Sequence, residues 1–126
     1  MTEDARRMGE VASAISNAVV HRLAETTGRG PTKARTTLGL DAVFVVLADS
    51  MTRGERTLVD RGEGVAVLDL RHRWQMAMRE EVCGDIERLT GRNVVGFMSD
   101  NHIDPDLAVE VFVLEPLPVE APDASG

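Results

Sequence analysis

Residues 28–35 combine residue types that could bind a small anion. The segment holds two glycines, which let backbone amides approach a ligand, and three basic side chains without any acid. Charge-assisted hydrogen bonds from these bases would hold a phosphate, a nucleotide or a similar anion. The candidate anion-binding residues are Gly28, Arg29, Gly30, Thr32, Lys33 and Arg35. The alternative is structural: Gly28 would end a helix, and the basic residues would offset the negative end of that helix.

Acidic residues and one histidine alternate along residues 100–106. Asp100, His102, Asp104 and Asp106 occupy every second position, and oxygen ligands at that spacing are typical of a calcium loop. The imidazole would also admit zinc or manganese, so the stretch is a candidate metal site and the centre of a candidate metal-dependent enzyme. Against this, the glycine and the distal glutamate of an EF-hand are absent, and the same residue types favour an ordinary hairpin turn.

Nucleophilic catalysis finds no support in the sequence. Cys83 is the only cysteine, which excludes an internal disulfide and a four-cysteine zinc site. Ser99, His102 and Asp104 are the residue types of a hydrolase triad, but neighbours in one loop do not adopt the triad geometry. We therefore expect a non-enzymatic protein without a cofactor.

The overall charge limits the classes of partner. The chain has 126 residues, of which 14 are basic and 21 acidic, and its formal net charge is −7. This balance argues against general nucleic-acid binding, which needs a basic surface. We expect a single domain over residues 1–115, followed by a disordered, acidic, proline-rich tail at residues 116–126. No apolar run approaches the roughly 20 residues of a membrane span, and the first residues lack the apolar stretch of a signal peptide, so we expect a cytoplasmic protein.

Hydrophobic periodicity predicts the elements that position these residues. The predicted helices cover residues 3–27, 52–62 and 64–90. The predicted strands cover residues 32–38, 42–47, 94–98 and 107–114, and residues 100–106 form a polar hairpin loop. The order α-β-β-α-α-β-β, with helices between two hairpins, predicts an α+β fold. We expect a two-layer sandwich with a mainly antiparallel four-stranded sheet and the helices on one face.

Two charged residues interrupt these apolar patterns. Arg71 lies in the apolar stripe of the predicted helix 64–90, which is tolerable if its aliphatic stem lies on apolar surface. Glu110 lies among the apolar residues of one face of the strand 107–114.

The strand at residues 42–47 is apolar on both sides, so both of its faces need a cover. A single layer of helices covers only one of them. A homodimer that packs sheet against sheet would cover the other, and an additional helix wrapped round the sheet is the alternative. We prefer the dimer, with Phe44, Val46, Trp74 and Met78 as its candidate interface residues.

Several motifs resemble those of MpsC-like domains, a family named after a sodium-translocating, membrane-potential-generating system. Residues 28–35, which follow an amphipathic helix, are similar to the Gly-x-Gly-Pro-x-x-Ala signature of that family. Further matches are, in order, Leu58-Val59, Gly62, Arg71, Met78-Arg79, Glu81, residues 89–92, Ser99-Asp100 and residues 109–115. The resemblance spans residues 10–115 and implies a small soluble protein with an accessory role beside a membrane cation or bicarbonate transport system. It implies no established enzymatic activity.

The sequence therefore leaves three functions open, of which we favour the first. The first is a non-enzymatic, dimeric accessory or regulatory domain that binds a partner protein, such as a membrane transporter subunit. The second is a sensor that binds a small anion or nucleotide at residues 28–35, with the dimer transmitting occupancy. The third is a metal-dependent enzyme at residues 100–106.

Overall fold

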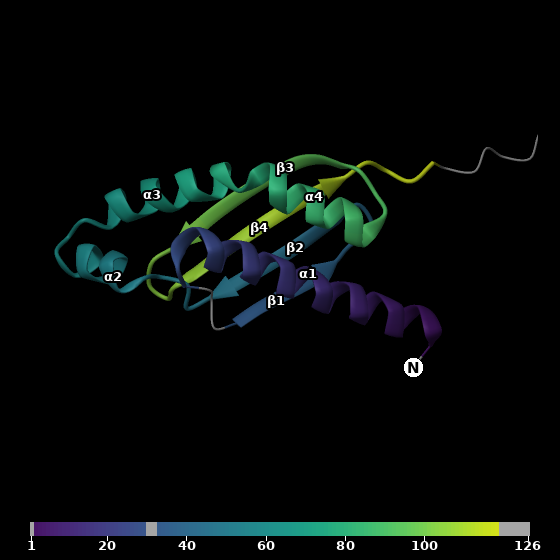
Figure 1. Ribbon diagram of the computed structural model, residues 1–126, viewed down its shortest axis with the longest axis horizontal. Helices are drawn as coiled ribbons and strands as arrows, with labels where there is room; N and C mark the ends of the chain where they lie inside the picture. Colours follow the sequence, from purple (N-terminus) through teal and green to yellow (C-terminus); the bar gives the residue numbers. More distant parts are fainter. Residues whose placement is uncertain (1, 30–32, 119–126) are drawn as a thin grey trace, which may run out of the picture.

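The computed structural model describes residues 2–29 and 33–118 (Figure 1). In chain order, the elements of this part are α1 (Glu3–Thr27), β1 (Lys33–Leu38), β2 (Ala42–Ala48), α2 (Arg53–Asp60), α3 (Gly64–Ala77), α4 (Arg79–Thr90), β3 (Val94–His102) and β4 (Leu107–Leu114). The expected α+β class and the predicted order of helices and hairpins are confirmed. Thr32, the predicted first residue of β1, and residues 119–126 of the predicted disordered tail lie outside the described residues.

The ends of α1 show why its sequence forms a helix over these residues. Thr2 Oγ1 accepts a hydrogen bond from Ala5 N at 3.1 Å, which satisfies one of the free amides of the first turn. Gly28 ends the helix at φ 78°, in the left-handed region that favours glycine, and donates its N–H to Ala24 O at 2.9 Å. The predicted structural role of Gly28 as a helix terminator is therefore confirmed.

The sheet has the strand order β1-β2-β4-β3, and all neighbouring strands are antiparallel. β1 with β2 and β3 with β4 form the two predicted hairpins, and β2 and β4 pair at the centre. The edge strands are therefore β1 and β3. Because side chains alternate along a strand, each strand presents one set of residues to each face of the sheet.

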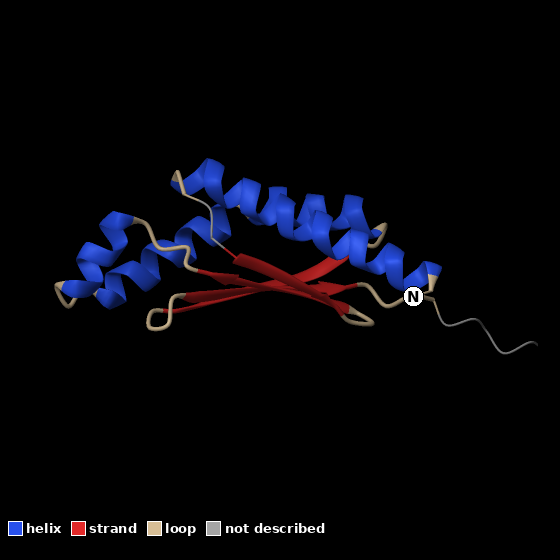
Figure 2. Ribbon diagram, turned by 90° about the horizontal axis from the view of Figure 1, so that it is seen from below, coloured by secondary structure: helices blue, strands red, loops and turns tan. Residues whose placement is uncertain are grey.

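The helices that cover the sheet lie on one of its faces, as predicted (Figure 2). α1 and α4 cover the sheet, whereas α2 and much of α3 project past one of its ends (Figure 1). The core between the two layers consists of Ile15, Val19, Leu23, Val43, Val45, Leu47, Met78, Val82, Ile86, Phe97, Ala108, Phe112 and Leu114. This core uses only one of the two faces of β2 and β4.

The segment predicted as one helix over residues 64–90 is divided in the structure. Met78 ends α3 and precedes α4 with φ −88° and ψ −5°, and its side chain is buried in the core. No glycine or proline marks this position, so the sequence pattern carried no signal for the break. Both helices contact β3, but α3 also contacts α2, whereas α4 also contacts α1.

The hairpin between β3 and β4 is tighter than predicted. β3 continues through Asp100 and Asn101 to His102, so the predicted loop at residues 100–106 is reduced to a turn at residues 103–106. The three polar residues pair in register with residues 107–109 of β4. Pairing with β4 therefore continues past the start of the polar run, and the polarity of these residues alone did not end the strand.

Candidate functional site

The face of the sheet turned away from the helices is apolar at its centre and open to solvent. Phe44 and Val46 on β2 are 41% and 43% exposed, and Met98 on β3 is 56% exposed. Val109 and Val111 of β4 lie between these strands and are half-buried. Among the described residues, no helix covers this side (Figure 2). We call this surface the open face and define it by Lys33, Arg35, Thr37, Phe44, Val46, Met98, Asp100, His102, Leu107, Val109 and Val111.

The antiparallel register arranges the open face in rows that run across the strands. One row consists of Arg35, Val46, Val109 and Asp100, from β1 to β3. The adjacent row consists of Thr37, Phe44, Val111 and Met98. The first row is therefore basic at one edge of the sheet, apolar in the middle and acidic at the other edge.

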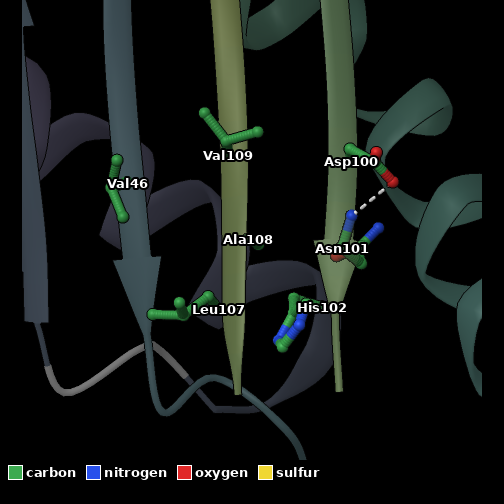
Figure 3. A pocket seen from close by; sticks show the side chains of 7 residues that line it. All are labelled: Val46, Asp100, Asn101, His102, Leu107, Ala108 and Val109. Atoms are coloured by element: carbon green, nitrogen blue, oxygen red, sulfur yellow. Dashed lines mark hydrogen bonds between the residues drawn. The ribbon is translucent and has the colours of Figure 1, made fainter. Parts of the chain in front are cut away.

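A shallow depression of about 280 Å³ lies on the open face near the turn between β3 and β4 (Figure 3). It is lined by Val46, Asp100, Asn101, His102, Leu107, Ala108 and Val109. Its lining is mostly apolar, and its polar groups have partners: Asp100 Oδ1 accepts a hydrogen bond from Asn101 N at 2.8 Å, and His102 Nδ1 donates to Pro105 O at 2.7 Å. An apolar floor with charged groups at its edge suits a protein side chain better than a small polar ligand.

The structure separates the four residues of the candidate metal site. Asp100 and His102 lie on the open face, and Asp104 lies in the turn that follows. Asp106 accepts a hydrogen bond from Met51 N at 2.9 Å and lies 3.5 Å from the guanidinium of Arg56. Within the part of the chain that the structure describes, no group of three or more His, Cys, Asp or Glu side chains could hold a metal ion.

The described basic residues of the candidate anion site lie in two different environments. Arg29 donates to the backbone oxygen of Asp49 at 3.2 Å and pairs with its carboxylate, also at 3.2 Å. Lys33 and Arg35 are exposed on the open face. Gly30 and Thr32 lie outside the described residues. Anion binding by this segment stays a prediction.

The candidate interface residues fall on both sides of the sheet. Phe44 and Val46 lie on the open face. Met78 is 4% exposed and belongs to the core between the sheet and the helices, and Trp74 lies half-buried in α3. An interface on the open face therefore includes Phe44 and Val46 but not Trp74 or Met78.

A buried polar network joins α2 and α3 to the sheet, and the sequence analysis did not find it. Arg71 donates from Nη1 to both carboxylate oxygens of Glu55 at 3.3 Å, from Nη2 to Ser50 Oγ, and from Nε to Asn101 Oδ1 at 3.0 Å. Gln75 and Asn101 exchange two further hydrogen bonds of 3.0 and 2.9 Å. These residues are buried or half-buried. The available signals were the arginine in an apolar stripe and the capping-box spacing from Thr52 to Glu55, which the structure confirms.

A second polar group is buried in the core between the sheet and the helices. Glu110 is 2% exposed, and burial raises the pKa of its carboxyl group to about 7. Ser99 of β3 lies directly opposite in the register. Among the described residues, Glu110 Oε1 and Ser99 Oγ have no hydrogen-bond partner. Burial also raises the pKa of the Cys83 thiol, and the charge of Glu110 contributes to that shift.

The comparisons with known proteins identify one family. A family model described as "MpsC: Na+-translocating membrane potential-generating system (MpsC)" matches residues 7–116, which is most of the chain. Comparison with curated proteins and with solved structures gave no significant match. No helix in the described ranges has both the length and the apolar character that crossing a membrane requires.

Proposed function

Because this chain belongs to the MpsC family, we propose that it is a non-enzymatic, cytoplasmic accessory subunit of a Na+-translocating, membrane-potential-generating system and that it acts as a homodimer. The family description supplies the link to that system. The proposed role is to bind a protein partner, which requires a surface suited to protein contacts.

The observation that carries the proposal is the open face. Its centre exposes Phe44 and Val46 of β2 and Met98 of β3, with Val109 and Val111 of β4 between them, and no helix of the described ranges covers this side of the sheet (Figure 2). Contiguous exposed apolar surface rimmed by polar residues marks protein interaction sites, because its burial is favourable. Sheet faces of this kind pack about 10 Å apart in two-layer sandwiches. A second copy of the same sheet supplies such a layer.

The homodimer is tested by sedimentation velocity over a range of protein concentrations. We expect Val46→Glu to be monomeric at concentrations where the wild-type chain is dimeric, because the new carboxylate would be buried without a partner. Val65→Glu is the matched control, since Val65 is 83% exposed on α3, away from the open face. A wild-type chain that is monomeric at every concentration would contradict the proposed dimer.

The link to the transport system is tested separately by affinity capture from native membranes. We expect subunits of a membrane ion-transport system to be retained by the tagged wild-type chain and identified by mass spectrometry. Retention of unrelated soluble proteins alone would contradict the proposed accessory role. Capture with Val46→Glu then shows whether the partner binds the dimer or the protomer.

A further inference from the structure

We propose that the open faces of two copies pack about a two-fold axis parallel to the strands, so that Arg35 of each copy pairs with Asp100 of the partner subunit. This inference rests on the proposed homodimer and specifies its geometry. It assigns Arg35 and Asp100, at opposite edges of the sheet, to one reciprocal contact.

The two charges occupy the same level of the sheet. Arg35 pairs in register with Val46, Val46 with Val109, and Val109 with Asp100. Both charged residues are exposed, and the described part of the structure contains no ion pair for either. Three strand spacings of about 4.8 Å separate β1 from β3, which is too far for a pair within one sheet. An ion pair between Arg35 and Asp100 therefore requires two copies of the chain.

A rotation about an axis parallel to the strands exchanges the two edges of the sheet and keeps each row at its level. The β1 edge of one copy then lies over the β3 edge of the other. Arg35 faces Asp100 of the partner subunit, and the same contact is repeated at the other edge, as an isologous interface requires. The gap of about 10 Å between packed sheets is one that an extended arginine and an aspartate close from opposite sides.

The apolar centre fits the same rotation. Figure 3 shows Val46 and Val109 on the two central strands, with Asp100 on the adjacent edge strand. The rotation places Val46 over Val109 of the partner subunit and Phe44 over Val111 of the partner subunit. Apolar side chains thus meet at the centre, and the Arg35–Asp100 pairs lie at the rim, which is the usual division of a stable interface.

The other in-plane axis, perpendicular to the strands, is disfavoured by charge. It would place the β1 edge of one copy over the β1 edge of the other. The outward-facing residues of β1 are Lys33, Arg35 and Thr37, which include two bases and no acid. Basic side chains would then oppose each other when the axis passes at the level of Lys33, of Arg35 or between them, and like charges across an interface suppress association.

Charge exchange distinguishes these geometries. We expect Arg35→Asp and Asp100→Arg each to weaken the homodimer by roughly tenfold or more, because each places like charges at both rim contacts. An equimolar mixture of the two variants should form a heterodimer, since both contacts then join opposite charges. The double variant Arg35→Asp/Asp100→Arg should dimerise again. Native mass spectrometry separates the species by mass, and sedimentation velocity gives their affinities.

Two control variants make the same changes of charge at residues that lie away from the open face. Arg6→Asp and Asp60→Arg alter exposed residues of α1 and α2 and should leave the dimer unchanged. Thermal melting of every variant verifies that it is folded. The mixture provides a readout that misfolding of a single variant cannot imitate, because only folded variants can rescue each other.

The results distinguish an error in the proposed two-fold axis from the absence of the dimer. If Val46→Glu is monomeric but both charge variants dimerise like the wild type, the dimer stands and the proposed axis is wrong. If Arg35→Asp binds the wild-type chain more tightly than the wild type binds itself, the axis is the perpendicular one. A wild-type chain that is monomeric at every concentration overturns both proposals.

Discussion

Arg71 of α3 donates hydrogen bonds from one nitrogen to both carboxylate oxygens of Glu55 in α2, and the two side chains are only 5% and 2% exposed. The same guanidinium also binds Ser50 and Asn101. One side chain therefore holds α2 and α3 against the end of the sheet. The desolvation of both charges is offset only while every partner is present.

Arg71→Ala is expected to lower the free energy of unfolding by about 3–5 kcal/mol, because it leaves the carboxylate of Glu55 buried without its cation. Urea denaturation measures the change. The control is Arg73→Ala in the same helix, where the pair with Asp69 at 2.9 Å is exposed and contributes about 1 kcal/mol or less. Equal losses for the two variants would show that burial adds nothing to the Arg71 pair.

Glu110 is expected to make the stability of the protein depend on pH. Its pKa is raised from 4.5 to about 7 in the folded state by burial, so the folded state binds the proton more tightly than the unfolded chain. The contribution of Glu110 to the free energy of unfolding is therefore fully present below pH 4.5. It is lost as the pH rises through 7, and the total loss is about 3 kcal/mol. Urea denaturation at a series of pH values measures this contribution.

The amide variant isolates that contribution. Glu110→Gln cannot ionise, so we expect it to be more stable than the wild type at pH 8 and to lose most of the decline between pH 5 and pH 8. Glu80→Gln, at an exposed position on α4, should keep the wild-type decline. If the free energy of unfolding of Glu110→Gln fell with pH as it does for the wild type, other groups would be the cause of the pH dependence.

Substitution by alanine is expected to have opposite effects on stability at Gly9, inside α1, and at Gly28, which ends this helix. Gly9 lies inside α1 with nothing within 4 Å of an added Cβ, so Gly9→Ala should stabilise the protein by roughly 1 kcal/mol. Gly28 has a φ of 78°, so Gly28→Ala should destabilise it by about 1 kcal/mol through strain. Thermal or urea unfolding gives both values. A neutral Gly28→Ala would remove the physical reason for glycine at the helix end.

Anion binding by the 28–35 segment is tested by thermal shift with phosphate, nucleotides and bicarbonate. An anion at 100 times its dissociation constant should stabilise the fold by about 2.7 kcal/mol. Lys33→Ala should reduce the shift if the exposed lysine binds the anion. Arg53→Ala, which removes an exposed base of α2, should leave the thermal shift unchanged. The absence of any shift with the wild type would remove support for an anion sensor.

Local patterns in the sequence were sufficient for most of the fold. Thr2 and Gly28 mark the ends of α1, and Thr52 with Glu55 marks the start of α2, because capping depends on residues three or four positions apart. The alternation along β4 likewise divided its residues into two faces, and the structure shows that the face carrying Glu110 is the buried one. These elements and their order, in turn, predicted an antiparallel sheet with helices on one side.

Tertiary structure decided which distant residues meet. The break at Met78 and the extension of β3 to His102 depend on contacts with other elements, and no local signal marks them. Asn101 was predicted in a loop, but the pleat of β3 turns it toward Arg71, whereas Asp100 faces the open side. Arg35 and Asp100 occupy one row only because strand pairing aligns four segments that are far apart in the chain. A sequence pattern records periodicity within one segment, and the register between segments is set by the packing of the whole sheet.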